Sequence, residues 1–305
     1  MANISLVICT YNRDRFLDET FASITNQSLA ANQYEVIIVD NNSTDNTAKK
    51  AKQFIEAHPQ LDIKYFFEAN KGLSFARNRG IKEALYDIIT YIDDDVILKN
   101  NFLQEINEFF INNPKAKGAG GKVIPKFEAG EPPVWNSKYV SGIVGNNGIE
   151  YPDRIVKYTK ELKYPIGCNM SYKRQVLTDA GGFNNELTFR SDDKDIFTRV
   201  SKITDEIYYL PSVILHHYID KERLEFVNFK KLYLKSGNEE RKRIKTEAGT
   251  FDLIKKFIEL VLKLGAGFII MILFTLKGQF PKGKYAFLAM WYTFVGFNKK
   301  TVFVR

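Results

Sequence analysis

The feature that most constrains the fold of this chain is a regular alternation of short apolar runs with amphipathic segments over its first 110 residues. The apolar runs cover residues 4–9, 35–39, 63–67 and 88–92, and each is long enough for one buried strand. Between them, apolar side chains recur at helical spacing. This order predicts repeated strand–helix units and a mostly parallel sheet.

The pattern changes after Asn100. A helix is predicted there, ending at Asn113-Pro114. Residues 118–165 are rich in Gly and Pro and include the cluster Gly145-Asn146-Asn147-Gly148, so we expect loops and edge strands around a site. Two further helices are expected, one over residues 173–180 and one starting near Asp193.

Charge is unevenly distributed along the chain. Residues 221–305 carry 18 Lys and Arg against 7 Asp and Glu, whereas the whole chain has 44 against 36. The 305 residues, 45% of them hydrophobic, are enough for a full α/β core and a smaller appendage. We therefore expect an α/β domain over residues 1–220 and a basic, apolar helical region over residues 221–305.

The C-terminal region mixes basic residues with apolar stretches, which favours an anionic lipid surface over nucleic acid. Residues 221–247 have the pattern of one or two basic amphipathic helices, and residues 264–276 and 285–297 are uncharged. Each uncharged stretch is shorter than the roughly 20 residues of a spanning helix. We expect a helical hairpin in the membrane interface; a helical subdomain packed on the rest of the chain or on a second subunit is the alternative.

The cysteines and the N-terminal residues do not resemble those of an exported protein. Cys9 and Cys168 lie in apolar segments without metal-ligand spacing, so buried, reduced thiols are expected. The apolar run over residues 4–9 has no basic stretch before it and no cleavage site after it. We therefore expect the chain at the cytoplasmic face of the membrane.

Three consecutive carboxylates, Asp93, Asp94 and Asp95, follow the predicted strand over residues 88–92. Ligands of open α/β sheets bind at the carboxyl ends of the strands. Adjacent acids repel one another, so three at a strand end indicate a bound cation or several hydrogen-bond donors. An acidic turn exposed to water is the alternative.

Polar residues also follow two other predicted strands. Asp40 comes after residues 35–39, and Thr10, Tyr11 and Asn12 come after residues 4–9. Neighbouring parallel strands would bring these ends and the three carboxylates to one rim, facing a common ligand. Each group by itself is also compatible with ordinary turn and cap chemistry.

Taken in order, segments of the first 220 residues resemble the motifs of the inverting glycosyltransferases of family 2. The segments are Thr10-Tyr11-Asn12, Asp40-Asn41-Asn42-Ser43-Thr44-Asp45, residues 70–80, Asp93-Asp94-Asp95, Gly167-Cys168-Asn169-Met170, Gly181-Gly182-Phe183 and Ser191-Asp192-Asp193-Lys194-Asp195. The resemblance implies a GT-A type α/β fold, with a Rossmann-like, mostly parallel central sheet flanked by helices. It also implies transfer of a sugar from a nucleotide-sugar donor, with a UDP-sugar as the first expectation.

The resemblance implies roles for residues on the donor side. Thr10, Tyr11, Asn12 and Asp40 would hold the nucleotide, and Arg77 would contribute to the charge balance of the diphosphate, a solvated helix position being its alternative. Asp93-Asp94-Asp95 corresponds to the D-x-D element, which holds a divalent metal, Mg²⁺ or Mn²⁺. Asp95 is implied as the first metal ligand, with Asp93 and Asp94 on the metal or the ribose. His217, six residues before Arg223, is implied as a further metal or phosphate ligand, with an ordinary strand-end position as its alternative.

Other roles concern the acceptor side. Asp193 matches the general base, and the chain departs from the usual Glu-Asp pair because Asp192 precedes it. Asp192 and Asp195 are the fallback residues, and helix capping could explain any of the three. Asn169 matches a segment that lines the sugar side, with a structural role as its alternative.

The resemblance further implies a saccharide or polyprenyl-linked acceptor, in polysaccharide or cell-surface glycan biosynthesis, and a membrane surface as partner. A sugar nucleotidyltransferase with the same core is one alternative, but the Gly-rich basic loop that it needs after the first strand is missing here. A non-catalytic membrane-bound scaffold is another. No nucleic acid partner is expected; the donor base, the sugar, the linkage and the oligomeric state are left open.

Overall fold

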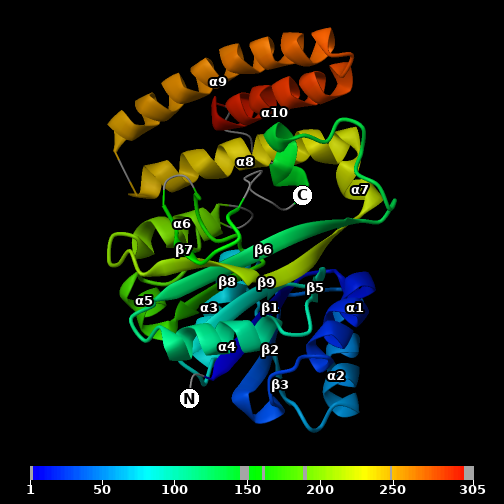
Figure 1. Ribbon diagram of the computed structural model, residues 1–305, viewed down its shortest axis with the longest axis vertical. Helices are drawn as coiled ribbons and strands as arrows, with labels where there is room; N and C mark the ends of the chain where they lie inside the picture. Colours follow the sequence, from blue (N-terminus) through cyan, green and yellow to red (C-terminus); the bar gives the residue numbers. More distant parts are fainter. Residues whose placement is uncertain (1–2, 145–150, 160–161, 188–190, 248, 299–305) are drawn as a thin grey trace. The chain divides into compact units, whose positions relative to one another are not determined.

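The structure is a computed structural model that describes residues 3–144, 151–159, 162–187, 191–247 and 249–298 (Figure 1). The Gly145-Asn146-Asn147-Gly148 cluster lies outside the described residues. Internal contacts divide the described chain into two compact units. The first comprises residues 3–124, 151–159, 162–187 and 192–218, and the second comprises residues 125–144, 191, 219–247 and 249–298.

The first unit begins with the predicted strand–helix units. Its parallel strands are β1 (Ile4–Thr10), β2 (Tyr34–Asp40), β3 (Asp62–Phe67) and β4 (Ile88–Asp93). They lie in the order β3-β2-β1-β4, with Ile4 level with both Tyr34 and Ile88. The helices between them are α1 (Asp14–Thr25), α2 (Thr47–Ala57) and α3 (Leu73–Glu83). The four strands and the three helices between them that the sequence predicts are confirmed. The helix predicted after Asn100 is also confirmed and is α4 (Phe102–Asn112).

The rest of the sheet is antiparallel. It contains β5 (Val96–Leu98), β6 (Gly118–Phe127), β7 (Val156–Lys157), β8 (Met170–Lys173) and β9 (Ile207–Ile219). Within the described residues the order is β3-β2-β1-β4-β8-β6-β9-β5, with β7 on β9. Two residues connect β4 to β5, although three strands lie between them in that order. The sheet is therefore curled, and the predicted α/β class is confirmed.

The expectation of only loops and edge strands over residues 118–165 is wrong at β6, which is an interior strand. Strand β6 is rich in glycine, which is typical of loops, and this is why the sequence did not predict an interior strand. The same glycines allow the neighbouring strands to approach β6 closely. A Cβ atom on Gly121 would lie 2.0 Å from the Val213 carbonyl oxygen, and one on Gly118 would lie 2.6 Å from the Tyr172 ring. Glycine inside a strand marks such close approaches.

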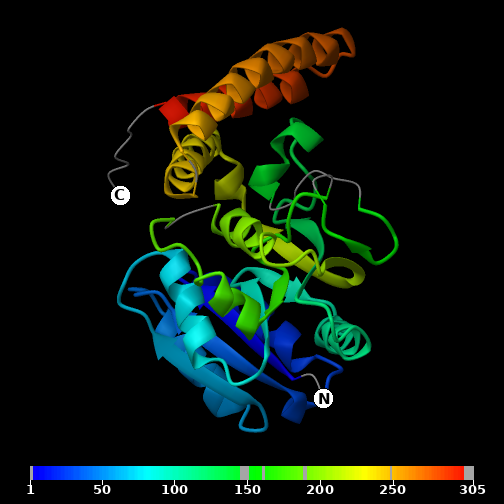
Figure 2. The same cartoon turned by 90° about the vertical axis from the view of Figure 1, so that its left-hand side faces the viewer.

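Both faces of the sheet are buried. Along β1 the side chains alternate between two apolar clusters, with Ile4, Leu6 and Ile8 in one and Val7 and Cys9 in the other. Helices α1, α2 and α4 cover the first face, and α3, α5 (Arg174–Asp179) and α6 (Asp192–Val200) cover the second (Figure 2). Strands buried on both faces read as continuous apolar runs, which is why the sequence identified them.

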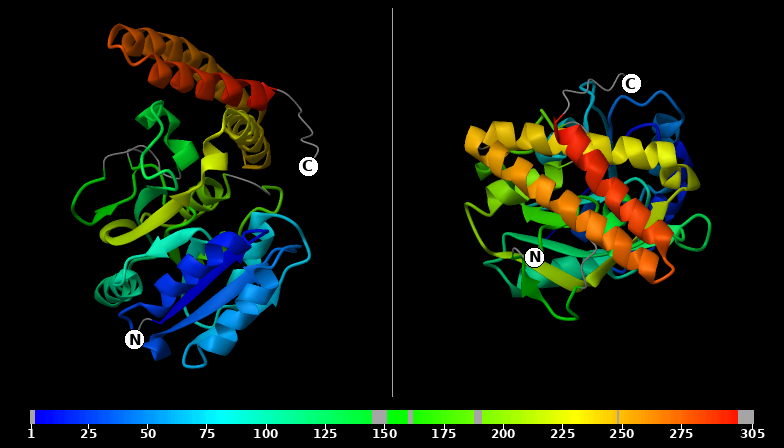
Figure 3. Two further views of the ribbon diagram at one scale, coloured as in Figure 1. Left: turned by 90° about the vertical axis from the view of Figure 1, so that its right-hand side faces the viewer. Right: turned by 90° about the horizontal axis from the view of Figure 1, so that it is seen from above.

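The second unit is mainly helical. Its helices are α7 (Lys221–Leu224), α8 (Phe226–Glu247), α9 (Thr250–Leu276) and α10 (Phe280–Asn298), with a 3-10 segment at Lys138–Val144. Helix α10 packs against both α8 and α9 (Figure 3). Trp135, Phe229 and Tyr285 form an aromatic cluster in the second unit. The Trp135 and Tyr285 rings are stacked, with their centroids 4.6 Å apart.

The expected helices over residues 221–247 and the hairpin that follows them are present. Helix α9 has 27 residues and extends well before the uncharged stretch that begins at residue 264. It is long and apolar enough to cross a membrane, and it is the one such helix among the described residues. The functional boundary expected at residue 220 stays a prediction.

Candidate active site

The carboxyl ends of three parallel strands bring the predicted residues together. Strand β1 lies between β2 and β4, with Thr10 level with Asp40 and Cys9 level with Asp93. Parallel strands all end at the same edge of a sheet, so the polar residues after each strand become neighbours. Thr10 and Asp40 are buried here, and Cys9 and Cys168 are buried free thiols, as expected.

An acidic cluster with one imidazole lies at this edge. Asp93, Asp95 and His217 each offer a ligand atom within 4.8 Å of the others. Strand β9 brings His217 opposite Val96, and its Nε2 atom lies 3.3 Å from Oδ1 of Asp95. Two carboxylates and an imidazole suit Mn²⁺, and the carboxylates also suit Mg²⁺. The donor set therefore fits the expected divalent metal.

A residue that the sequence did not identify, Arg13, belongs to the same cluster. Its guanidinium donates to Asp95, and its Nε atom lies 3.5 Å from Asp94. Burial and the Asp95 carboxylate raise the pKa of Asp94 to about 7, although Arg13 acts in the opposite direction. The only sequence signal for Arg13 is its place directly after Thr10-Tyr11-Asn12, at the start of α1.

The segment after β2 lies beside the end of β1 and is held by side-chain hydrogen bonds. Asp40 accepts from the Ser43 backbone N–H at 2.9 Å and from the Tyr65 hydroxyl at 2.8 Å. Burial, with the Asp40 carboxylate, raises the pKa of Tyr65 well above its ordinary range. Sequence reasoning missed Tyr65, because nothing in a half-buried strand shows that its phenol reaches the next strand.

Tyr11 and Asn12 occupy different positions in this region. The Tyr11 side chain is 45% exposed, and the Lys71 ammonium lies 5.7 Å from its ring. Asn12 adopts a positive φ of 53° and accepts from the Thr44 backbone N–H at 2.7 Å. The Tyr11 ring is thus partly accessible, with Lys71 over one of its faces, whereas the Asn12 side chain fixes one loop to the next.

Arg77 lies buried rather than at the solvated helix position considered above. Its guanidinium pairs with Asp192, donates to the Gly167 carbonyl at 3.2 Å and lies 3.7 Å from Asp93. Burial acts to lower the pKa of Arg77, but the Asp192 and Asp93 carboxylates outweigh it and raise that pKa. Arg77 therefore remains protonated and connects the acidic cluster to the start of α6.

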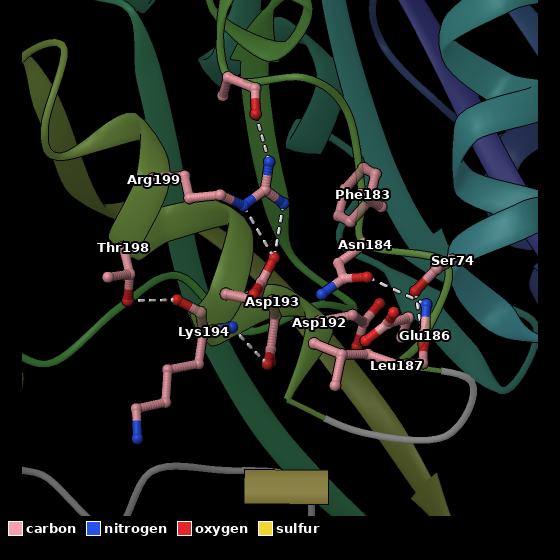
Figure 4. Close-up of polar contacts among 12 residues, drawn as sticks. Ser74, Phe183, Asn184, Glu186, Leu187, Asp192, Asp193, Lys194, Thr198 and Arg199 are labelled. Atoms are coloured by element: carbon pink, nitrogen blue, oxygen red, sulfur yellow. Dashed lines mark hydrogen bonds and ion pairs between the residues drawn. The ribbon is translucent and has the colours of Figure 1, made fainter. Parts of the chain in front are cut away.

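The three acids at the start of α6 have different partners, and Figure 4 shows two of them, Asp192 and Asp193. Asp192 faces Arg77, and Asp195 pairs with Arg199 at 2.5 Å; both acids are buried. Asp193 is only partly buried and accepts from the Gly167 backbone N–H at 3.1 Å. Of these acids, Asp193 is the one that an incoming group could reach.

Asn169 lies directly before strand β8. Its amide donates to the carbonyls of Lys122 and Val213, each at 3.3 Å, and its side chain is buried. It thus connects strands β6 and β9 next to the start of β8. This arrangement supports the structural alternative for Asn169.

Comparison with known proteins assigns the family. The model for "glycosyl transferase family 2" matches residues 5–181, which is more than half of the chain. The chain belongs to glycosyl transferase family 2. The family 2 match covers β1 to β4 and the acidic cluster apart from His217.

Relatives of this family 2 chain include enzymes of two kinds. The glucosyl-dolichyl phosphate glucuronosyltransferase of Haloferax volcanii is 26% identical over 237 residues, covering 73% of this chain and 71% of the relative. The poly-beta-1,6-N-acetyl-D-glucosamine synthase of Staphylococcus epidermidis is 28% identical over 218 residues. That match covers 69% of this chain but only 48% of the synthase.

Solved structures show the same fold at low identity. The mannosyltransferase PcManGT from Pyrobaculum calidifontis, in complex with GDP-Man and Mn²⁺, has a TM-score of 0.63 at 16% identity and covers 95% of this chain and 86% of its own. S. aureus TarS 1–349, in complex with UDP, has a TM-score of 0.58 at 14% identity and covers 96% and 90%. These neighbours support the GT-A type fold of the family 2 chain.

Proposed function

We propose that this chain is an inverting, metal-dependent glycosyltransferase of the hexosyltransferase class. It transfers a sugar from a nucleotide-sugar, with a UDP-sugar as the first expectation, to a saccharide or lipid-linked saccharide. The observation that carries the proposal is the gathering of Asp93, Asp95 and His217 within 4.8 Å, on the same edge of the sheet as Asp40.

Asp95 and His217, with Asp93, would hold a divalent cation, Mg²⁺ or Mn²⁺. When bound, such an ion supplies a Lewis acid that neutralises the charge developing on the departing diphosphate. The protein contributes the rigidity of the ligand set, because Asp95 and His217 are both buried and come from paired strands or the turn beside them. The solved mannosyltransferase with GDP-Man and Mn²⁺ is consistent with this role.

The nucleotide would lie over the ends of β1 and β2. Tyr11 offers an exposed aromatic face for stacking on the base, and the Asp40 carboxylate offers an acceptor for a base N–H. Asp40 already accepts two hydrogen bonds, but a carboxylate has about four lone-pair sites. Asn12 and Tyr65 would act by holding these groups in place.

Asp193 would be the general base. Its side chain is partly exposed, and the Gly167 and Lys194 N–H groups each donate to one of its oxygens. A carboxylate has about four lone-pair sites, so Asp193 can still accept from an acceptor hydroxyl. By taking the hydroxyl proton while the oxygen attacks from the side opposite the nucleotide, Asp193 would permit inversion. Asp192 would hold the helix start through Arg77.

The second unit supports a membrane location for the acceptor. Small residues carry the contact between α9 and α10: a Cβ on Gly267 would lie 2.6 Å from the Met290 sulfur, and one on Gly283 would lie 2.8 Å from Met271. Large apolar side chains of α9, such as Phe268, Ile269 and Leu273, face outward. Membrane helices pack through small residues and present large ones to lipid. We propose that this hairpin binds the cytoplasmic face of the membrane.

The names of the relatives support a role in glycan biosynthesis. One acts on a dolichyl phosphate-linked sugar, as its name states, and another is a polysaccharide synthase. A sugar nucleotidyltransferase is less well supported, because β1 is joined to α1 by the short turn at residues 11–13 rather than by a Gly-rich loop. A non-catalytic scaffold would have no need of the Asp93, Asp95 and His217 cluster.

The deciding experiment is isothermal titration of the full chain in detergent with UDP, GDP and dTDP, each with and without Mn²⁺. We expect one nucleotide to bind only when Mn²⁺ is present, and we expect Asp95→Ala to lose that binding. Binding of none of the three by the folded protein would contradict the proposal and favour the scaffold.

A further inference from the structure

Arg13 forms ion pairs with Asp94 and Asp95 and directly precedes α1. Its guanidinium donates to Oδ2 of Asp95, while Oδ1 of the same carboxylate lies 3.3 Å from His217. Its Nε atom lies 3.5 Å from Asp94. The positively charged Arg13 side chain therefore binds the same Asp95 carboxylate that is proposed to hold the metal.

Two arginines lie beside the consecutive aspartates Asp93, Asp94 and Asp95, and their exposure differs. Arg77 has a side chain only 4% exposed; it pairs with Asp192 and donates to the Gly167 carbonyl. Arg13 has a side chain 30% exposed, and its guanidinium lies 4.3 Å from the centre of the Phe16 ring. The Arg13 side chain therefore borders solvent, whereas that of Arg77 is enclosed by the protein.

A divalent cation on Asp95 would lie close to the Arg13 guanidinium. Two like charges at such a distance repel each other strongly, and the repulsion is larger where water is partly excluded. A guanidinium released from a carboxylate fits a phosphate equally well, because it offers the same planar pair of donors. The diphosphate of a nucleotide-sugar would bring such phosphates to this edge of the sheet.

We propose that Arg13 is a displaceable counter-cation of the metal site. Without metal it neutralises Asp94 and Asp95; when a divalent cation binds Asp95, Arg13 leaves and pairs with the diphosphate of the donor. The metal and the nucleotide then bind cooperatively. The metal releases Arg13 for the diphosphate, and the diphosphate supplies a new partner for the guanidinium that the metal displaces. The inference rests on the proposed function for its diphosphate step, but not for its metal step.

The test measures Mn²⁺ binding to the full chain by electron paramagnetic resonance, without nucleotide. Arg15→Ala is the matched control, because it removes the same charge two residues away and beside the same Phe16 ring. We expect Arg13→Ala to tighten Mn²⁺ binding about tenfold, and Arg15→Ala to change it by less than about twofold. The proposal would be overturned if both substitutions changed the Mn²⁺ affinity equally. It would also be overturned if neither the parent protein nor the two variants bound Mn²⁺.

A second titration, at saturating Mn²⁺, uses whichever of UDP and GDP binds the parent protein. Arg13→Ala should weaken this binding about tenfold, so that one substitution strengthens the metal and weakens the nucleotide. Unchanged nucleotide binding would refute the transfer of Arg13 to the diphosphate. If neither nucleotide binds the parent protein, the proposed function fails, and inorganic pyrophosphate takes the place of the nucleotide with the same expected loss.

Discussion

Arg77 of α3 and Asp192 of α6 form a buried ion pair between residues 115 positions apart in the chain. Both side chains are only 4% exposed. The pair fixes the first turn of α6, which carries Asp193, against the helix that follows β3. It also places the Arg77 guanidinium 3.7 Å from Asp93, so that the proposed base and the proposed metal site share one support.

Removing one partner of this pair should be costly. We expect Arg77→Ala to lower the free energy of unfolding by about 3–5 kcal/mol, because it leaves Asp192 buried without its counter-charge. Chemical denaturation measures the loss. Arg79→Ala is the control, since its partly exposed pair with Glu83 should contribute less than about 1 kcal/mol. A loss for Arg77→Ala no larger than for the control would show that the pair does not hold the fold.

Asp193→Asn should separate rate from binding. An amide cannot take the acceptor proton, so we expect kcat of sugar transfer to fall by about 10²–10⁴, while the nucleotide dissociation constant stays within a factor of about two. The matched control is Asp205→Asn, an exposed acid that pairs with Lys157 on the surface. If Asp193→Asn retained the parent rate, the base would have to be another group.

His217 and His216 are adjacent but face opposite sides of β9, one buried and the other exposed. We expect His217→Ala to weaken Mn²⁺ binding by about tenfold or more, because a ligand is lost, and His216→Ala to leave it unchanged. Titration with Mn²⁺ alone checks both. Equal binding by the two variants would remove His217 from the metal site.

One carboxylate holds the starts of two helices. Asp45 accepts from the Thr47 N–H of α2 at 3.0 Å and from the Asp14 N–H of α1 at 3.1 Å. Partial burial acts to raise the pKa of Asp45, but the Thr47 hydroxyl and these two N–H donors outweigh it and hold that pKa below its ordinary value. A carboxyl with a lowered pKa stabilises the fold above its ordinary pKa and loses that effect as the pH falls through the lower one.

We therefore expect Asp45→Ala to cost about 1 kcal/mol at pH 7. The difference in stability between parent and variant should shrink as the pH falls below about 4, where the carboxyl takes up a proton. Thermal denaturation of both proteins across this range measures it. A difference that grows on acidification would contradict the assignment.

The outward face of α9 should determine membrane binding. Ile269 and Ile272 are both exposed, and removing each from lipid should forfeit about 1.5–3 kcal/mol. The double variant Ile269→Glu, Ile272→Glu should lose most of its flotation with anionic vesicles. Ile203→Glu, which changes an exposed isoleucine of the first unit in the same way, is the control. Unchanged flotation of the double variant would exclude this face.

The sequence predicted the parallel half of the sheet because its strands are buried on both faces and therefore appear as uninterrupted apolar runs. It also identified the rim, since Thr10, Asp40 and Asp93 each end a strand that could be recognised. The antiparallel half was harder. Strand β6 contains glycines whose purpose becomes visible only when Val213, about 90 residues later, is packed against them.

The site residues that escaped prediction depend on contacts between distant segments. Arg13 was overlooked because its role follows from the way α1 begins, which turns the guanidinium back over Asp95. Arg77 itself was predicted as a site residue, but its buried pairing with Asp192, 115 residues away, was not. Local spacing carries information about strand ends and helix faces, but not about which charges meet across the fold.

Strands β4 and β5 are joined by two residues, although three other strands separate them in the sheet. Asp94 and Asp95 are those two residues, so the acidic turn is the seam at which the curled sheet meets itself. His217 stands on the far side of that seam, on the strand paired with β5. An ion held by Asp95 and His217 would link the β4–β5 connection to strand β9. The affinity for the ion and the curvature of the sheet would then depend on each other. A substitution that disturbs β9 far from the ion would therefore also weaken the binding of the ion.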